Sequence, residues 1–160
     1  MANMIVTQFF GILQESVKLR VEVLDGLTDA DLAYKLPGAN PTLGELLQEL
    51  GQMMHIYNES FKTFVLDYNV RAGGEVAHSV VALEAWFADL DQEMYAVLER
   101  LTDEQITGQT VDRSVFGEAF PVGVNFHTLR EGLLIYYGKL SCYLKAMDRP
   151  LPPQMARWIG

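Results

Sequence analysis

The sequence predicts an all-α fold, a single four-helix bundle domain that spans residues 1–160. Three observations lead to this prediction. Four long segments repeat apolar residues at three- and four-residue intervals, no segment shows the sustained alternation of a strand, and 49% of the residues are hydrophobic. Amphipathic helices of this length bury their apolar stripes most directly against one another, which favours a bundle with a substantial core.

The first long helix is expected between Ile5 and Leu24, and Gly26 ends it. The capping-like sequence Thr28–Asp31 then predicts a short turn of helix before Pro37. The residues expected to face inward from the first helix are Ile5, Phe9, Leu13, Val17, Val21 and Leu24.

The second long helix is expected to begin near Pro41 and Thr42, because proline and threonine are common at helix starts. The segment Arg71–Glu75 interrupts the pattern with two glycines and predicts a flexible link. The expected inward residues of the second helix are Leu43, Leu47, Leu50, Met54, Tyr57, Phe61 and Val65.

The third helix is expected to begin after Ser79, which can cap it. Its expected inward residues are Leu83, Phe87, Leu90, Met94, Val97 and Leu101. A second capping-like sequence, Thr102–Gln105, follows, and the chain is then expected to form a loop through Gly117.

The fourth helix is expected to open at Pro121 or Val122, and Arg149–Pro153 stops it ahead of a short tail. Its expected inward residues are Phe126, Leu129, Leu133, Tyr137, Leu140, Leu144 and Met147. The connections between the first and second helices and between the third and fourth are long enough to cross the ends of the bundle. An up-down-up-down order is therefore not forced.

Composition excludes several classes of partner. The formal charge of −9, from 21 acidic and 12 basic residues with no basic cluster, repels phosphate backbones and anionic lipid surfaces. Nucleic-acid and membrane partners are therefore not expected, and apolar runs fall far short of the roughly 18 residues that span a bilayer. The absence of a secretory signal pattern and the single Cys142 predict a cytoplasmic protein without an internal disulfide.

The histidines are the obvious candidates for a metal site in a bundle. A helical wheel places His55 on the solvent side of the second helix, and it places His127 and Glu131 outside the apolar stripe of the fourth. The His127–Glu131 pair has the i, i+4 spacing of metal ligands but points outward. These three residues are therefore the less favoured metal candidates, and no catalytic residue is predicted.

Two segments carry a resemblance to a known family. Residues Thr42–Glu49, TLGELLQE, resemble the second-helix signature of the DinB-like metalloenzyme family, and Tyr136–Pro153, YYGKLSCYLKAMDRPLPP, resembles its closing segment. With the helical periodicity, the resemblance spans most of the chain. It implies a four-helix bundle that commonly holds a divalent metal, such as zinc or nickel, with three histidines, and it mildly favours a homodimer.

The resemblance places the family's three ligand positions on Glu49, Gly132 and Tyr136, none of which is histidine, and places a family glutamine on Lys139. One carboxylate, one phenol and a neighbouring ammonium are a poor set for zinc or nickel, so no metal cofactor is expected. The hypothesis is that Glu49 accepts hydrogen bonds from Tyr136 and Lys139, with Gly132 leaving room for the ring. An eroded site filled by packing is the alternative.

Three functions remain open at this point. The first is a non-catalytic or small-ligand-binding protein of the DinB-like type, with Glu49, Gly132, Tyr136 and Lys139 as the candidate pocket. The second, which the resemblance to the DinB-like family implies, is a metal-dependent thiol transferase or hydrolase. The third is a structural or interaction protein that acts as a homodimer, because Leu134, Ile135 and Cys142 place apolar groups on the outer side of the fourth helix. Packing of the tail over that surface is the alternative to a dimer.

Overall fold

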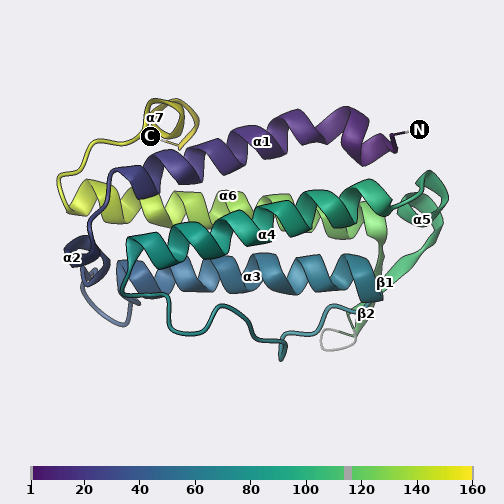
Figure 1. The fold of residues 1–160 in the computed structure, drawn as a ribbon, viewed down its shortest axis with the longest axis horizontal. Coiled ribbons are helices and arrows are strands. Elements are labelled where there is room, and N and C mark those ends of the chain that lie inside the picture. The colour runs from purple at the N-terminus through teal and green to yellow at the C-terminus, as the bar shows by residue number, and fades with distance from the viewer. Residues whose placement is uncertain (1, 114–116, 160) are drawn as a thin grey trace.

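A computed structural model describes residues 2–113 and 117–159 of the chain. Its four long helices are α1 (Met4–Asp25), α3 (Leu43–Thr63), α4 (Val80–Arg100) and α6 (Val122–Ala146), and they pack as a bundle (Figure 1). The predicted all-α four-helix bundle is confirmed, and each long helix begins within two residues of its predicted start. Within the described residues, no helix combines the length and the apolar character needed to cross a bilayer.

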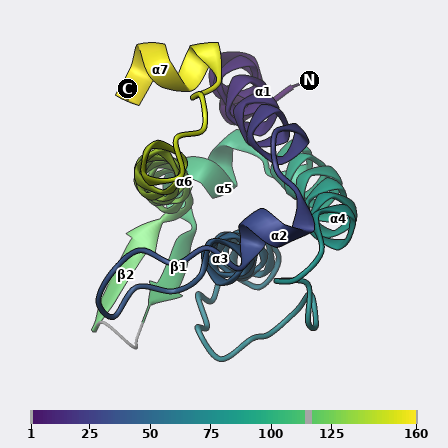
Figure 2. The ribbon, with the colours of Figure 1, turned by 90° about the vertical axis from the view of Figure 1, so that its left-hand side faces the viewer.

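The order of the helices around the bundle is not the simple alternating one. Helices α1 and α6 run in one direction and α3 and α4 run in the other (Figure 1), and α1 lies diagonally opposite α3 in the end view (Figure 2). The connection from α1 to α3 crosses the end of the bundle and contains the short helix α2 (Asp29–Leu32). A long loop, residues 64–79, then returns along the outside of α3, so that α4 starts at the same end as α3.

Side-chain capping explains where these helices begin. Thr42 accepts a hydrogen bond from the backbone of Glu45, whose carboxylate accepts one from the Thr42 backbone in return, at 3.1 and 2.7 Å. The Ser79 side chain caps α4 in the predicted way, and Thr102 and Gln105 form a second reciprocal pair at the start of α5 (Asp103–Gly108). Each cap satisfies backbone N–H groups that the first turn of a helix leaves without partners.

The predicted loop through Gly117 is wrong where the structure describes it, because two short strands form there. Strands β1 (Thr110–Arg113) and β2 (Glu118–Pro121) pair in an antiparallel hairpin, with Val111 opposite Phe120. Four residues are too few to show a strand period in the sequence. Residues 114–116 of the predicted loop lie outside the described part of the chain.

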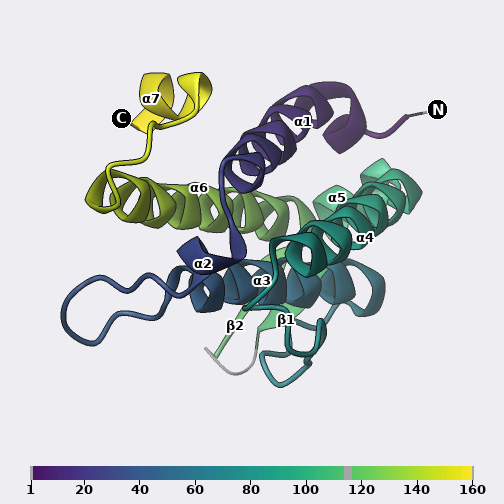
Figure 3. The same cartoon turned by 60° about the vertical axis from the view of Figure 1, so that its left-hand side comes forward.

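The tail beyond the fourth long helix is also ordered into a helix. Helix α7 (Pro153–Ile159) lies beside α1 and α6 at one end of the bundle (Figure 3). Its residue Met155 is fully buried in the core cluster, and Gln154 donates a hydrogen bond to the backbone of Glu15 in α1. The tail therefore closes a side of the bundle between the first and last long helices.

The apolar stripe predicted for α1 is wrong at Val21, where the core contains the neighbouring arginine instead. Val21 is 46% exposed, whereas Arg20 beside it is buried to 1% exposure. The Arg20 guanidinium forms an ion pair with Asp91 of α4 and lies 4.3 Å from the centroid of the Phe87 ring. The bundle centre between α1 and α4 thus contains a paired charge where the apolar pattern predicts valine.

The glycine-containing segment predicted as a flexible link is held against the bundle. Gly73 has a φ of +84°, and a Cβ built on it would lie 2.4 Å from the Trp86 ring. A Cβ built on Gly51 of α3 would also lie 2.4 Å from the Trp86 ring. Only residues without a side chain therefore allow the ring to pack at these two positions. The Gln52 amide makes hydrogen bonds to the backbone of Val70 and of Ala72, of 2.6 and 3.1 Å.

Candidate functional site

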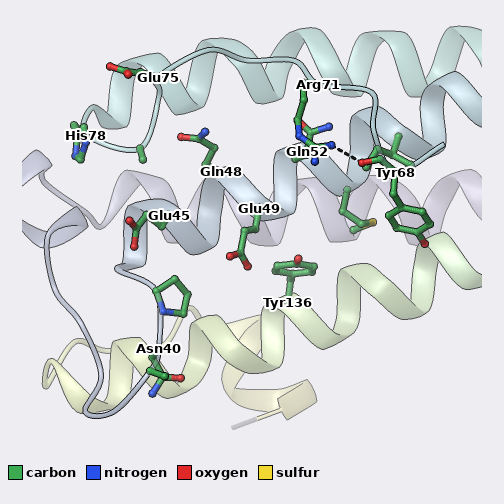
Figure 4. A pocket seen from close by; sticks show the side chains of 15 residues that line it. Asn40, Glu45, Gln48, Glu49, Gln52, Tyr68, Arg71, Glu75, His78 and Tyr136 are labelled. Carbon is green, nitrogen blue, oxygen red and sulfur yellow. Dashed lines mark hydrogen bonds between the residues drawn. The ribbon is translucent and has the colours of Figure 1, made fainter. Parts of the chain in front are cut away.

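A pocket of about 980 Å³ lies between α3, α6 and the loop of residues 64–79 (Figure 4). Its apolar lining includes Met53, Ile56 and the ring of Tyr136. Its polar lining consists of Asn40, Glu45, Gln48, Glu49, Gln52, Tyr68, Arg71, Glu75 and His78. The combination of an apolar wall with a few polar groups is typical of a small-molecule site.

Glu49 of α3 and Tyr136 of α6 point toward each other across this pocket (Figure 4). Both extend into the space between α3 and α6 in Figure 4, Glu49 being exposed and Tyr136 half-buried. Burial raises the pKa of the Tyr136 hydroxyl, and the nearby negative charge of Glu49 raises it further. Among the residues that the structure describes, Glu49 has no hydrogen-bond or ion-pair partner.

The expected hydrogen bonds from Tyr136 and Lys139 to Glu49 are not formed between these described residues. The Lys139 ammonium instead lies 4.8 Å from the centroid of the Tyr136 ring, a cation–π contact on the outside of the pocket lining. Gly132 does not make room for the Tyr136 ring either. A Cβ at Gly132 would lie 3.3 Å from the Met53 sulfur, so it is Met53 that uses the space.

Most of the other polar groups in the pocket already have partners. The Glu45 carboxylate belongs to the α3 cap, and its hydrogen bonds with Thr42 lower its pKa. Arg71 donates to the backbone carbonyls of Tyr68 and Val70. Among the described residues, Glu49 and Glu75 are the lining carboxylates without a hydrogen-bond or ion-pair partner, and Glu49 is the one whose charge raises the pKa of Tyr136.

The loop that forms one wall of the pocket was not predicted from the sequence. Tyr68, Arg71, Glu75 and His78 all come from residues 64–79, which the sequence marks only as a break between helices. The glycine pair within that loop was the available signal, since a glycine with positive φ permits the close approach to Trp86. Nothing in the local pattern indicates that the loop returns along α3.

The residues that the resemblance places at the DinB-like ligand positions do not fit a zinc or nickel ion. Gly132 offers no donor atom, and the raised pKa of Tyr136 opposes the phenolate that would bind a metal. Lys139 adds a positive charge against the Tyr136 ring. Glu49 is then the single good ligand, whereas protein sites for these ions use three or four.

The other metal candidates divide into two cases. His127 and Glu131 are exposed, as the wheel predicts, and the His127 ring packs edge-on against Phe9 with centroids 5.2 Å apart. His55 is half-buried between α3 and α4, so its predicted position on the solvent side is wrong. Its ring nitrogens lie near the carboxylates of Glu59 and Glu93.

Comparisons with known proteins agree on the fold. No protein-family model and no curated protein matches the sequence. A crystal structure of a DinB-like protein from Bacillus cereus ATCC 10987 superposes with a TM-score of 0.72 and 18% identity, covering 90% of this chain and 95% of that one. A crystal structure of the DinB-like protein YjoA from Bacillus subtilis gives 0.70 and 19%, covering 94% and 96%.

Coverage of 90% or more in both directions means that the likeness extends over most of the bundle. Sequence identities of 18% and 19% support a shared fold, but they do not support a shared activity. The chain therefore has the fold of the DinB-like proteins.

Proposed function

We propose that this protein binds a small organic cation in the pocket between α3 and α6, without a metal at that place. One observation carries the proposal: Glu49 is a carboxylate without a hydrogen-bond or ion-pair partner among the described residues, near the half-buried Tyr136, at the edge of a cavity of about 980 Å³. Such a volume accommodates a compact organic molecule. A ligand ammonium at Glu49 would supply the charge partner that the described residues do not.

The chemistry of the lining indicates the ligand class. Met53 and Ile56 offer apolar contact area, and the face of the Tyr136 ring attracts both flat apolar groups and cations. The carboxylates of Glu49 and Glu75 outnumber the single guanidinium of Arg71, whose Nη1 group already donates to two backbone carbonyls. A protein with a formal charge of −9 also attracts cations at long range. An amine attached to an apolar or aromatic body fits these features best.

Three probes of the same size test the proposal: benzylamine, benzyl alcohol and benzoate. We expect benzylamine to raise the melting temperature and to perturb the Tyr136 ring signals in NMR spectra, benzyl alcohol to do so more weakly, and benzoate not at all. Glu49→Gln should remove the preference for the amine. Glu131→Gln, which changes an exposed carboxylate of α6 outside the pocket, is the matched control. Equal or tighter binding of benzoate would contradict the proposal.

A second candidate function is self-association through the outer side of α6. Leu134 is 45% exposed and Ile135 is 60% exposed, even though α7 packs its fully buried Met155 against the bundle. The tail therefore leaves these two residues uncovered, which favours a homodimer. Light scattering of the full chain and of Ile135→Glu tests this, because an introduced charge should convert a dimer to a monomer without unfolding it. A monomeric parent protein would exclude the dimer.

We further propose that the protein works in the cytoplasm and does not bind nucleic acid. The single cysteine, Cys142, is exposed and free, which suits a reducing compartment. The net charge of −9 opposes a phosphate backbone. Fractionation of cells that express the chain, and a filter-binding assay with mixed oligonucleotides at low salt, test these two points.

A further inference from the structure

We propose a second site, for a divalent transition-metal ion, where His55 and Glu59 of α3 meet Glu93 of α4. One ligand atom of each residue lies within 4.8 Å of the others. Imidazole nitrogen with two carboxylate oxygens is a donor set that suits zinc and similar ions, and it leaves further coordination positions for water. None of the three residues lines the α3–α6 pocket, so this site is separate from the proposed function above.

Rigid elements position the three ligands. His55 and Glu59 are one helical turn apart, which places them on the same face of α3. Glu93 comes from the neighbouring helix α4 and faces them across the helix contact. A metal ion would therefore bind to preformed helices, which requires little ordering of the chain.

Asn58 supports the site from within the core. Its side chain is fully buried, and its Nδ2 donates one hydrogen bond to the Glu93 Oε2 atom at 3.1 Å and another to the Leu90 carbonyl at 3.0 Å. Glu93 is thereby oriented with its Oε1 atom directed at the Lys62 ammonium. The Asn58 Oδ1 atom is buried without a hydrogen-bond partner among the described residues. Outer hydrogen bonds of this kind are typical of metal-ligating carboxylates.

A protein cation already contacts both carboxylates. The Lys62 ammonium lies 2.7 Å from the Glu59 Oε1 atom and forms a second ion pair with the Glu93 Oε1 atom. Two carboxylate oxygens, one from Glu59 and one from Glu93, thus contact the same ammonium group.

Lys62 can leave this position. Its side chain is 37% exposed, and a four-carbon stem allows the ammonium to swing into solvent. A divalent ion would replace it with twice the charge and with direct bonds to both carboxylates and to the imidazole. Lys62 is then a competitor whose removal should strengthen metal binding.

The test uses full-length protein without an affinity tag, stripped with a chelator and titrated with Zn²⁺ by calorimetry. We expect one zinc ion per chain, binding about tenfold tighter in Lys62→Met, and about tenfold weaker or worse in His55→Asn and in Glu93→Gln. His127→Asn, which removes the exposed histidine of the other i, i+4 pair, should bind zinc as the parent protein does. Circular dichroism spectra check that each variant is folded.

Four results would overturn the proposal. The parent protein could fail to bind one zinc ion, the Lys62→Met variant could bind it no better, or His127→Asn could lose it to the same degree as His55→Asn. A zinc ion that is lost in Glu49→Gln and kept in Glu93→Gln would place metal binding in the α3–α6 pocket instead. The Co²⁺ form supplies a second readout, since its visible absorption should change in His55→Asn and stay unchanged in His127→Asn.

Discussion

Two charged regions of the bundle differ in how their polar groups are matched. Between α1 and α4, Arg20 is 1% exposed and is paired with Asp91, with Phe87 packed against the guanidinium. Between α3 and α6, Glu49 is exposed and has no partner among the described residues. The first region is closed by its own side chains, and the second leaves a charge available. The charges of Arg20 and Asp91 are matched within the chain, although the Arg20 Nε and Asp91 Oδ1 atoms are buried without hydrogen-bond partners among the described residues. The charge of Glu49 is not matched in this way and can serve a ligand.

The neighbouring residues Tyr136 and Tyr137 show the same difference on one helix. Tyr137 is buried and donates a hydrogen bond of 2.8 Å to the backbone carbonyl of Ser16. The Tyr136 hydroxyl has no such bond within the described part of the chain and faces the pocket. Adjacent positions on a helix point about 100° apart, so one turns to the core and the other to the cavity.

The largest expected effect is on the closed pair. Asp91→Ala leaves Arg20 charged and buried without a partner, and we expect the free energy of unfolding to fall by about 3–5 kcal/mol. Urea denaturation followed by circular dichroism measures this loss. The matched change in the open region, Glu49→Ala, should alter stability by no more than about 0.5 kcal/mol.

A double replacement sharpens that contrast. Burial raises the pKa of Asp91 and Arg20 offsets only part of the rise, which indicates that ionising this carboxyl inside the bundle is unfavourable. We therefore expect Arg20→Met with Asp91→Leu to restore most of the stability that Asp91→Ala loses. Comparable losses from Asp91→Ala and Glu49→Ala would remove the distinction between the two regions.

The hydroxyls of Tyr136 and Tyr137 should ionise at different pH values in an alkaline titration. Burial raises the pKa of Tyr137 from 10.0 to about 12. Because the folded state holds this proton more tightly than the unfolded state, Tyr137 stabilises the fold less and less as the pH rises from about 10 to about 12, by about 2–3 kcal/mol in total. Ultraviolet absorbance should show one tyrosine ionising last, and Tyr137→Phe should remove that step.

Tyr136→Phe is the control for this titration, since the Tyr136 hydroxyl is only half-buried and makes no hydrogen bond to the described residues. It should leave the last ionisation step in place. If both phenylalanine variants lose the same step, the two faces of α6 do not differ in the way proposed.

The smallest expected effects come from two glycines of α6. A Cβ at Gly138 would meet no atom within 4 Å, so Gly138→Ala should stabilise the helix by up to about 1 kcal/mol. At Gly132 the Met53 sulfur would lie 3.3 Å away, so that tight contact should cancel most of the same gain. Melting temperatures of the two variants measure the difference, and equal gains would mean that Met53 does not press on this wall of the pocket.

Local rules account for the parts of the fold that could be predicted. Thr42, Ser79 and Thr102 mark helix starts because their side chains bond to backbone groups only two or three residues away. The hairpin of β1 and β2 was not predictable in this way, because four-residue strands have no readable period. The burial of Arg20 in place of Val21 depends on Asp91, which lies on another helix.

The sequence by itself determined the four long helices, their caps and the bundle, since periodicity and capping act within a few residues. It also identified Glu49 and Tyr136 as edge residues of α3 and α6 that could share a pocket. Only the tertiary structure decided that the return loop forms a wall of that pocket and that His55 meets Glu93. Contacts between residues far apart in the chain depend on helix order and loop path, which the local pattern leaves free.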